Sequence, residues 1–297
     1  MESMNYQEIK IEEEDDVLGA LAKSYPDTSK STLRKWVAHN RVRFKGRAVI
    51  NAKTSLKPGD TLKLYDKRKT LDQRLHIIYS DADIVAVDKP FGLLSVATYY
   101  ESQATAHDIL KQNKAFNRVF PVHRLDRETS GVMVFALNDR ARDGLKDQFH
   151  THSIIREYHA VVEGAPKENQ GTWKHHLIED ANYKMHTSKK GVLSITHYKV
   201  GCVSKPYAYL ICHLETGKKN QIRVAASLAG HPIVGDTKYG GANSPINRMG
   251  LHAHSLGFKH PITGKSLCFY SAVPQNFIRL FKEHKAFFTK MQQKDKL

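Results

Sequence analysis

The sequence predicts an α+β protein: a mixed, mainly antiparallel sheet with flanking helices, preceded by a small N-terminal α/β domain. Apolar or alternating runs at 75–94, 194–200 and 207–214 are bounded by turn residues, which is the pattern of antiparallel strands. Stretches at 105–114 and 138–152 instead repeat apolar residues at helical spacing. With 297 residues, of which 40% are hydrophobic, the chain suits one large domain joined to a small one.

The N-terminal part of the chain predicts two helices followed by a small antiparallel unit. Residues 14–24 place apolar side chains on one helical face, with acidic residues in the first turn that suit the helix dipole. Pro26 ends this helix, and Ser29 or Ser31 can cap a second one. Between residues 41 and 65, apolar and basic residues alternate around glycine turns, which is typical of short antiparallel strands.

Basic residues are concentrated in one segment. The chain carries a formal net charge of +16, and residues 28–69 hold thirteen Lys and Arg but two acidic residues. These charges are interleaved with Trp36 and Phe44, a mixture that favours a nucleic-acid partner over a surface that is merely soluble. Residues 66–74 are charged and aperiodic, which predicts a linker.

Several classes of protein are disfavoured by what the sequence lacks. No apolar run reaches the length of a membrane span and the acidic N-terminus is unlike a secretory signal, so we expect a cytoplasmic protein. The cysteines, Cys202, Cys212 and Cys268, form no CxxC pair, which argues against a disulfide framework or a structural zinc site. His252 and His254 share one side of a strand without further ligands in view, so we expect no metal. Without a GxGxxG or P-loop motif, we expect no nucleotide cofactor.

The most informative stretch is 121–136, which reads PVHRLDRETSGVMVFA. Its second half is apolar and rich in β-branched and aromatic residues, as in a buried strand. Its first half places Asp126 between Arg124 and Arg127, with Gly131 as a hinge before the strand. A carboxylate on a turn against a buried strand is rigidly held and electrostatically tuned, which predicts a catalytic group. The alternative is an ordinary aspartate that caps a turn.

The order His-Arg-Leu-Asp-x-x-Thr-Ser-Gly at 123–131 resembles the catalytic signature of the RluA-type pseudouridine synthases. Three further runs resemble motifs of that family: Asp-Lys-Pro-x-Gly-Leu-Leu at 88–94, Gly-Asp-x-x-Tyr-Gly at 235–240, and the stretch from Leu251. The resemblance spans about residues 75–275 and implies a pseudouridine synthase catalytic domain over 75–297.

The basic N-terminal segment resembles the S-four RNA-binding domain, first known from a ribosomal protein. The resembling runs are Thr32–Val37, Arg41–Gly46 and Lys57–Asp60. The resemblance implies an RNA-binding domain over 1–66, joined by a linker over 67–74. The residues expected to contact RNA there are Arg34, Lys35, Arg41, Arg43 and Lys45.

The resemblance to the synthases implies a reaction and roles for four residues. The reaction is the isomerisation of specific uridines in structured RNA, ribosomal or transfer, to pseudouridine, and it needs no cofactor. Asp126 would be the catalytic carboxylate, which either attacks the ribose or removes a ribose proton. Arg223 would pair with this carboxylate, and Tyr158 would stack on the uracil or relay its carbon-bound proton. Arg124 would fill the space left by a uridine that flips out of its helix.

The chain departs from the family pattern in one run. Where the family reads Thr-Gly-Arg-x-His-Gln-Ile-Arg, residues 216–223 read TGKKNQIR. Lys218 replaces an arginine, which keeps the charge but not the planar bidentate bonding, and Asn220 replaces a histidine. Arg223 is retained. We expect Lys218 and Lys219 to contact RNA.

Two segments carry no chemistry in this interpretation. Residues 165–192 are polar and predict a loop or a hairpin insertion. Residues 275–291 predict a single amphipathic helix at the C-terminal end. We expect the protein to be a monomer.

Two other functions stay open at this point. One is a non-catalytic RNA-binding or ribosome-assembly protein in which Asp126 is a relic. The other is a different RNA-modifying enzyme, such as a methyltransferase, which would need a glycine-rich cofactor loop that the sequence does not show.

Overall fold

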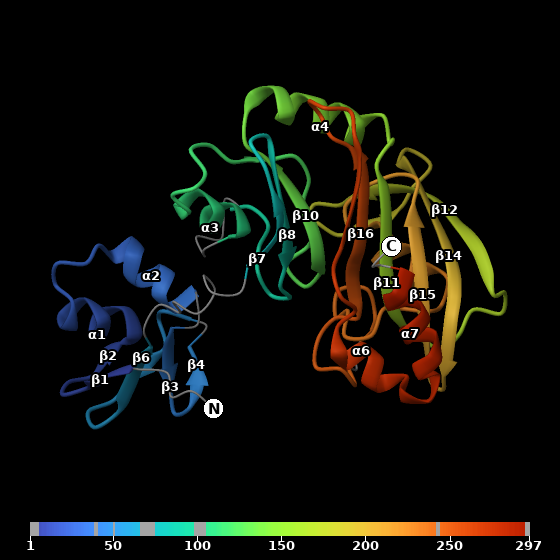
Figure 1. The fold of residues 1–297 in the computed structure, drawn as a ribbon. Helices are drawn as coiled ribbons and strands as arrows, with labels where there is room; N and C mark the ends of the chain where they lie inside the picture. Colours follow the sequence, from blue (N-terminus) through green and yellow to red (C-terminus); the bar gives the residue numbers. More distant parts are fainter. Residues whose placement is uncertain are drawn as a thin grey trace. The chain divides into compact units, whose positions relative to one another are not determined.

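The computed structural model describes residues 6–38, 41–49, 51–65, 75–97, 105–241 and 244–294. The chain divides into two units, residues 1–70 and residues 71–297 (Figure 1). Each unit has its own hydrophobic core. The predicted linker at 67–74 lies outside the described residues. None of the described helices is long and apolar enough to cross a membrane.

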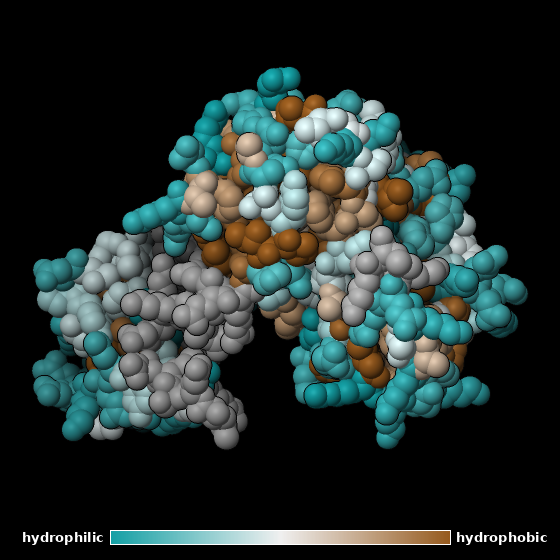
Figure 2. Space-filling view, in the orientation of Figure 1, coloured by the Kyte–Doolittle hydropathy of each residue, from teal (hydrophilic) through white to brown (hydrophobic). Residues whose placement is uncertain are grey.

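The first unit packs two helices against a small sheet. The helices are α1 (Val17–Ser24) and α2 (Lys30–Ala38). The sheet contains, in spatial order, β1 (Tyr6–Lys10), β6 (Thr61–Tyr65), β3 (Val42–Phe44) and β4 (Arg47–Ala48). A separate pair joins β2 (Asp15–Asp16) to β5 (Ser55–Leu56). The visible face of this unit is mostly hydrophilic (Figure 2), while Leu21, Leu33 and Leu62 are fully buried beneath it.

Helix α1 begins later than the sequence pattern predicts. Asp16 is its N-cap, because the Asp16 side chain accepts a hydrogen bond of 2.7 Å from the backbone N–H of Gly19. The first turn of the helix contains no acidic residue. Asp16 therefore stabilises this helix by capping its N-terminus. The prediction of acidic residues within the first turn was wrong.

The second unit is built on a sheet of eleven strands. In chain order they are β7 (His76–Ser80), β8 (Ile84–Lys89), β9 (Phe120–Pro121), β10 (Ser130–Ala136), β11 (Ile155–Glu163), β12 (Gln170–Glu179), β13 (Met185–Thr187), β14 (Val192–Ser204), β15 (Tyr207–Leu214), β16 (Leu251–Lys259) and β17 (Ser266–Tyr270). The spatial path is β13-β12-β14-β15-β11-β16-β10-β8-β7, with β17 beside β16 and β9 beside β10. The β10–β16 pair is parallel and the other pairs are antiparallel, which confirms the predicted mixed, mainly antiparallel sheet.

Helices flank this sheet at both ends of the unit (Figure 1). They are α3 (Ala106–Gln112), α4 (Asp139–His150), α5 (Gln221–Leu228), α6 (Gln275–Leu280), the short 3₁₀ helix η2 (Lys282–His284) and α7 (Lys285–Lys294). The predicted insertion at 165–192 contains β12 and β13, which form a hairpin that extends the sheet.

The prediction of a single C-terminal helix over 275–291 was wrong. Helix α6 ends at Leu280, because the next residue, Phe281, has a φ of −110° and a ψ of 39°, outside the helical region. The chain then continues through η2 into α7. This break lets Phe281, Phe287 and Phe288 meet the ring of Tyr209 edge-on, with centroids 5.1 to 5.7 Å apart. Burial of these aromatic rings outweighs the continuity of the helix.

Strand β10 fixes the position of the Asp126 turn. All seven of its residues are buried, between β8 on one side and β16 on the other. Gly131 has a φ of +117°, and a Cβ at this position would lie 2.0 Å from the carbonyl oxygen of Ala253. A side chain has no room there, so the strand can approach β16 this closely only with glycine. The turn that precedes the strand is thereby held against the centre of the sheet.

Candidate active site

The Asp126 turn is anchored by its own backbone. The hydroxyl of Ser95 donates to the carbonyl of Leu125 at 2.7 Å and accepts from the N–H of Leu125 at 3.0 Å. The N–H of Thr129 donates to the carbonyl of Asp126 at 3.1 Å and closes the turn. Because Ser95, Leu125 and Thr129 are all buried, the carboxylate of Asp126 stands on a rigid support.

His123, the first residue of the motif, supports the strand. Its Nε2 accepts a hydrogen bond of 3.1 Å from the backbone N–H of Val134, and its ring stacks on Phe149 with centroids 4.6 Å apart. Burial, followed by the charge of Arg156, lowers the pKa of His123 to about 3. The imidazole is therefore neutral at physiological pH, as its acceptor role requires.

Two donors hold the carboxylate of Asp126. Arg223 Nη1 donates to Asp126 Oδ2 at 2.8 Å, and Asn220 Nδ2 donates to the same oxygen at 2.6 Å. The side chain of Arg223 is 7% exposed and that of Asp126 is 23% exposed. The structure thus brings the predicted Arg223 against the predicted Asp126, and it adds Asn220, to which the sequence pattern gave no role.

Asp236 fixes Arg223 from behind. Arg223 Nε donates to Asp236 Oδ2 at 2.7 Å and Arg223 Nη2 donates to Asp236 Oδ1 at 2.8 Å, a bidentate pair that is almost fully buried. Burial alone would lower the pKa of Arg223, but the hydrogen bonds and charge of Asp236, with the charge of Asp126, raise that pKa above its usual value. The Gly-Asp-x-x-Tyr-Gly run at 235–240 contains Asp236 and indicated that this region matters. The pairing of Asp236 with Arg223 is seen only in the folded chain.

Asn220 is placed by an unusual backbone conformation. It precedes α5 with a φ of +52°, in the left-handed region that asparagine tolerates better than most residues. Its Oδ1 accepts a hydrogen bond of 3.1 Å from the hydroxyl of Tyr239, which orients the amide so that Nδ2 faces Asp126. The departure from the family histidine therefore keeps a donor beside the carboxylate.

The site opens into a cleft of about 840 Å³. Asp126, Asn220 and Arg223 line this cleft together with Tyr158, which lies on β11. Burial raises the pKa of Tyr158 to about 12, with a smaller upward contribution from the charge of Asp126, so its hydroxyl is protonated at neutral pH. The predicted Asp126, Tyr158 and Arg223 all lie at one site.

The predicted basic residues Arg124, Lys218 and Lys219 also line the cleft. Arg124 is exposed, whereas Lys219 forms an ion pair with Glu179 at the end of β12. The ammonium of Lys219 also lies 5.4 Å from the ring centroid of Tyr183. Glu179 and Tyr183, from the segment 165–192 to which the sequence analysis assigns no chemistry, also line the cleft.

The Asp-Lys-Pro-x-Gly-Leu-Leu run packs beside the Asp126 turn. The N–H of Gly92 donates to the carbonyl of Arg127 at 2.9 Å. Lys89 is fully buried and its Nζ donates to the carbonyls of Leu93 at 2.7 Å and Pro90 at 3.0 Å. This ammonium ties the motif together through backbone carbonyls and does not line the cleft.

Lys89 gives a pH dependence of stability. Burial, followed by the charge of Arg248, lowers the pKa of Lys89 from 10.5 to about 7. The unfolded chain therefore binds this proton more tightly than the folded one, so the free energy of unfolding rises with pH between about 7 and about 10, by at most about 1.4 kcal/mol per pH unit. Urea unfolding of the wild type and of Lys89→Met across this range isolates the effect. A difference between the two proteins that does not change with pH would contradict it.

In the first unit, Arg41 and Arg43 lie over aromatic rings. The guanidinium of Arg41 is 4.9 Å from the Trp36 ring centroid, and its Nε donates to the carbonyl of Tyr65 at 2.9 Å. The guanidinium of Arg43 is 5.0 Å from the Tyr65 ring centroid. These contacts hold the two arginines in fixed orientations on the strands.

Two further predicted RNA contacts of this unit, Arg34 and Lys45, are exposed. Arg34 lies on the outer face of α2, and the side chain of Lys35 is outside the described part of the chain. Lys45 and Gly46 form the two-residue turn between β3 and β4, with φ values of +48° and +78°. Lys45 Nζ lies 3.3 Å from Asp60 Oδ1, and the side chain of Lys45 is 74% exposed.

Comparisons with known proteins identify one family. A family model described as RNA pseudouridylate synthase matches residues 83–228. An RNA pseudouridine synthase of Bacillus subtilis (strain 168), YlyB, named as uncharacterized, is 31% identical over 279 residues, which cover 88% of this chain and 91% of that protein. Ribosomal large subunit pseudouridine synthase D of Vibrio parahaemolyticus is 30% identical over 289 residues, which cover 88% of each chain.

Solved structures share the fold. Human RNA pseudouridylate synthase domain containing 4 superposes with a TM-score of 0.60 at 24% identity, covering 71% of this chain and 94% of that one. Human RNA pseudouridylate synthase domain containing 1 gives a TM-score of 0.57 at 25% identity, covering 68% of this chain and 85% of that one.

The chain belongs to the RluA-type family of RNA pseudouridine synthases. Its activity is that of an isomerase that acts on RNA.

Proposed function

We propose that this chain converts uridine to pseudouridine in ribosomal RNA, with Asp126 as the catalytic carboxylate. The observation that carries the proposal is the arrangement at Asp126: one carboxylate at the wall of a cleft, held by Arg223 and Asn220 on a rigid turn. An RNA-binding protein without chemistry would have no use for a buried arginine that aims a carboxylate into an open cleft.

The reaction moves one glycosidic bond from nitrogen to carbon. The bond between the ribose and uracil N1 breaks, the uracil turns, a bond forms to uracil C5, and the C5 proton moves to N1. Asp126 serves this sequence either as the nucleophile at the ribose or as the base that takes a ribose proton to give a glycal. Both routes need an anionic carboxylate at a fixed position, which the pair with Arg223 supports.

In this proposal, Tyr158 acts on the uracil. Its ring offers a stacking surface in the cleft, and its hydroxyl is protonated at neutral pH. Arg124 is exposed at the same cleft, where its guanidinium suits the space that a flipped uridine leaves in the RNA.

Replacing Tyr158 by phenylalanine separates the two roles of this residue. The variant keeps the ring and loses the hydroxyl. If the hydroxyl relays the C5 proton, we expect the rate to fall by about 10²- to 10⁴-fold with unchanged RNA affinity. Release of tritium from RNA that contains 5-tritiated uridine, under single-turnover conditions, measures the rate. A wild-type rate would leave stacking as the role of Tyr158.

We also propose that residues 1–66 are an S-four-like domain that anchors the RNA. The support is the density of basic residues between 28 and 69 and the arginines stacked on Trp36 and Tyr65. Such a surface binds phosphates and unpaired bases without specifying the reaction. Arg41 and Arg43 therefore contribute to affinity, while Asp126 supplies the chemistry.

The ribosomal assignment is supported by relatives whose names specify the large ribosomal subunit, and it is tested in cells. Pseudouridine is mapped in ribosomal and transfer RNA from cells with and without the gene, and after rescue with the wild type or Asp126→Asn. We expect a ribosomal RNA site that disappears on deletion and returns with the wild type alone. A lost site in transfer RNA would correct the substrate, and rescue by Asp126→Asn would favour a non-catalytic role.

A further inference from the structure

Two arginines are buried at the candidate active site, and they differ in their partners. Arg223 pairs with the carboxylates of Asp126 and Asp236, which offset its charge. Arg156 is 7% exposed, and its buried Nε and Nη2 have no hydrogen-bond partner among the described residues. Because a guanidinium stays protonated in a protein, Arg156 is a buried cation to which the described part of the chain gives no hydrogen-bonded counter-charge.

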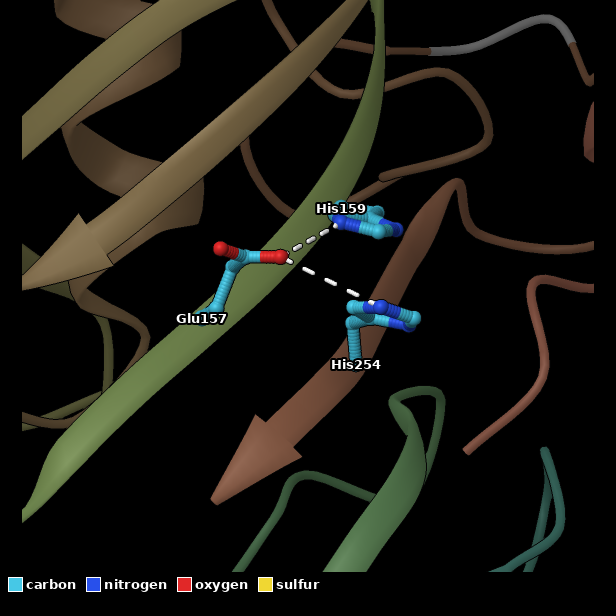
Figure 3. A group of neighbouring side chains, drawn as sticks. All are labelled: Glu157, His159 and His254. Carbon is cyan, nitrogen blue, oxygen red and sulfur yellow. Dashed lines mark hydrogen bonds and ion pairs between the residues drawn. The ribbon is translucent and has the colours of Figure 1, made fainter. Parts of the chain in front are cut away.

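The carboxylate that follows Arg156 in the sequence points away from it. Side chains alternate along a strand, so Glu157 and His159 leave β11 on the face opposite to Arg156. Figure 3 shows Glu157 directed at His159, with Glu157 Oε1 3.0 Å from His159 Nε2. The other oxygen of this carboxylate lies 2.9 Å from His213 Nε2. Glu157 is therefore engaged by histidines on the far side of the strand.

Arg156 shares its face of β11 with Tyr158. The two residues are two positions apart, so both side chains project toward the cleft that Tyr158 lines. Gly217 lines the same cleft, and a Cβ at Gly217 would lie 2.4 Å from Arg156 Nη1. The guanidinium therefore lies against the backbone of Gly217, at the wall of the cleft.

The charge of Arg156 reaches the residues of the site. Burial raises the pKa of Tyr158 to about 12, and the charge of Arg156 opposes this rise. Burial, followed by the same charge, lowers the pKa of His123 to about 3. Coulomb energy falls only with the inverse of distance and is weakly screened in a protein interior. A buried guanidinium can therefore act on a group in the cleft without contact.

The proposed reaction places negative charge on the uracil in this cleft. When the bond between the ribose and uracil N1 breaks, both bonding electrons stay on the uracil, which becomes an anion. The charge leaves the uracil when C5 forms the new bond to the ribose, after which the C5 proton moves to N1. Both routes that are open to Asp126 pass through the uracil anion.

We propose that Arg156 stabilises the uracil anion electrostatically, from behind the wall of the cleft. The inference rests on the proposed function and adds a residue to which the sequence motifs gave no role. Arg223 is less suited to this task, because two carboxylates offset its charge. A charge that is already in place in a water-excluded site stabilises a developing anion more than the same charge in water.

A buried cation without a carboxylate partner also lowers stability, which gives the inference a second readout. Moving a guanidinium out of water is unfavourable unless a counter-charge and hydrogen bonds compensate for the lost hydration. Methionine has a similar length and no charge. We therefore expect Arg156→Met to unfold at a higher urea concentration than the wild type. A residue that serves only to support the fold would give the opposite result.

The test measures rate and stability on the same full-length variants. The rate is that of single-turnover pseudouridine formation in an RNA that contains the mapped site, with RNA affinity measured separately. For Arg156→Met we expect a rate about 10²- to 10³-fold lower at unchanged affinity. Arg156→Lys keeps a positive charge and should stay within about tenfold of the wild type. Arg279→Met, at an exposed position of α6, is the control and should match the wild type in both measurements.

A second substrate tests whether the charge acts on the uracil. Fluorine at C5 withdraws electrons, so 5-fluorouracil forms a more stable anion than uracil. The loss of 5-fluorouridine from the RNA, followed by nuclease digestion and chromatography, measures cleavage of its glycosidic bond. We expect Arg156→Met to lower this rate by a smaller factor than it lowers the rate with uridine. An equal factor for both bases would contradict stabilisation of the uracil anion.

Three further outcomes would overturn the inference. They are Arg156→Met at the wild-type rate, Arg156→Met that is less stable than the wild type or does not fold, and Arg156→Lys as slow as Arg156→Met. If Asp126→Asn is inactive while Arg156→Met keeps the wild-type rate, the inference fails and the proposed function stands. A wild type that forms no pseudouridine would remove both.

Discussion

Replacing Asp126 by asparagine is expected to lower the rate of pseudouridine formation at least about 10⁴-fold, with the fold unchanged. The amide has the shape of the carboxylate but is neither a nucleophile nor a base at the ribose. Arg223 keeps its bidentate partner Asp236 in this variant, so the buried guanidinium is not left without a counter-charge. The expected loss is therefore in the chemical step and not in stability or RNA affinity.

Single-turnover kinetics on an RNA substrate, with RNA binding measured separately, test this prediction. Asp139→Asn is the matched control, because Asp139 also pairs with arginine but lies at the surface, with its side chain 46% exposed. The control should react at the wild-type rate. An Asp126→Asn variant that retained more than about a hundredth of the wild-type rate would show that another group performs the chemistry.

Replacing Asp236 by alanine is expected to reduce the free energy of unfolding by about 3 to 5 kcal/mol. Asp236 is 1% exposed and accepts hydrogen bonds from Nε and Nη2 of Arg223, so its removal leaves a buried cation with part of its hydrogen bonds unmade. Arg223 also loses the support that aims it at Asp126. We therefore expect kcat to fall while RNA affinity is maintained.

Urea unfolding, with both the midpoint and the slope recorded, measures the loss of stability. Asp143→Ala is the control, since Asp143 pairs with Arg142 at 2.8 Å but has a side chain that is 66% exposed. An exposed pair of this kind contributes about 1 kcal/mol or less. If the two variants unfold at the same urea concentration, the buried pair is not the support described above.

The sequence was sufficient for several of the strands and for the central motif. The apolar run after Gly131 and the alternation at 207–214 predict β10 and β15 because burial on one or both faces dictates those patterns. Asp126, Tyr158 and Arg223 came from the resemblance, and they line one cleft. Their roles in catalysis stay predictions until the variants are measured.

The sequence did not predict contacts that the fold creates between distant segments. Asn220 reaches Asp126 across 94 positions of the chain, and its donor role depends on a left-handed backbone that the sequence pattern does not specify. Glu179 and Tyr183 reach the cleft because β12 extends the sheet, which polar composition alone did not indicate. His254 gained Glu157 and His159 as neighbours by strand pairing across almost one hundred residues.

The two hydrogen-bond donors on Asp126 also distinguish its two carboxylate oxygens. Oδ2 accepts hydrogen bonds from both Arg223 and Asn220, at 2.8 and 2.6 Å, so both of its lone pairs are engaged. If Asp126 acts as proposed, the oxygen left to meet the sugar is Oδ1, whichever of the two routes operates. Among the described residues, the carboxylate thus keeps Oδ1 as the oxygen that accepts no side-chain hydrogen bond. In the proposed reaction, the choice between the two carboxylate oxygens would accordingly be made by Asn220 and Arg223.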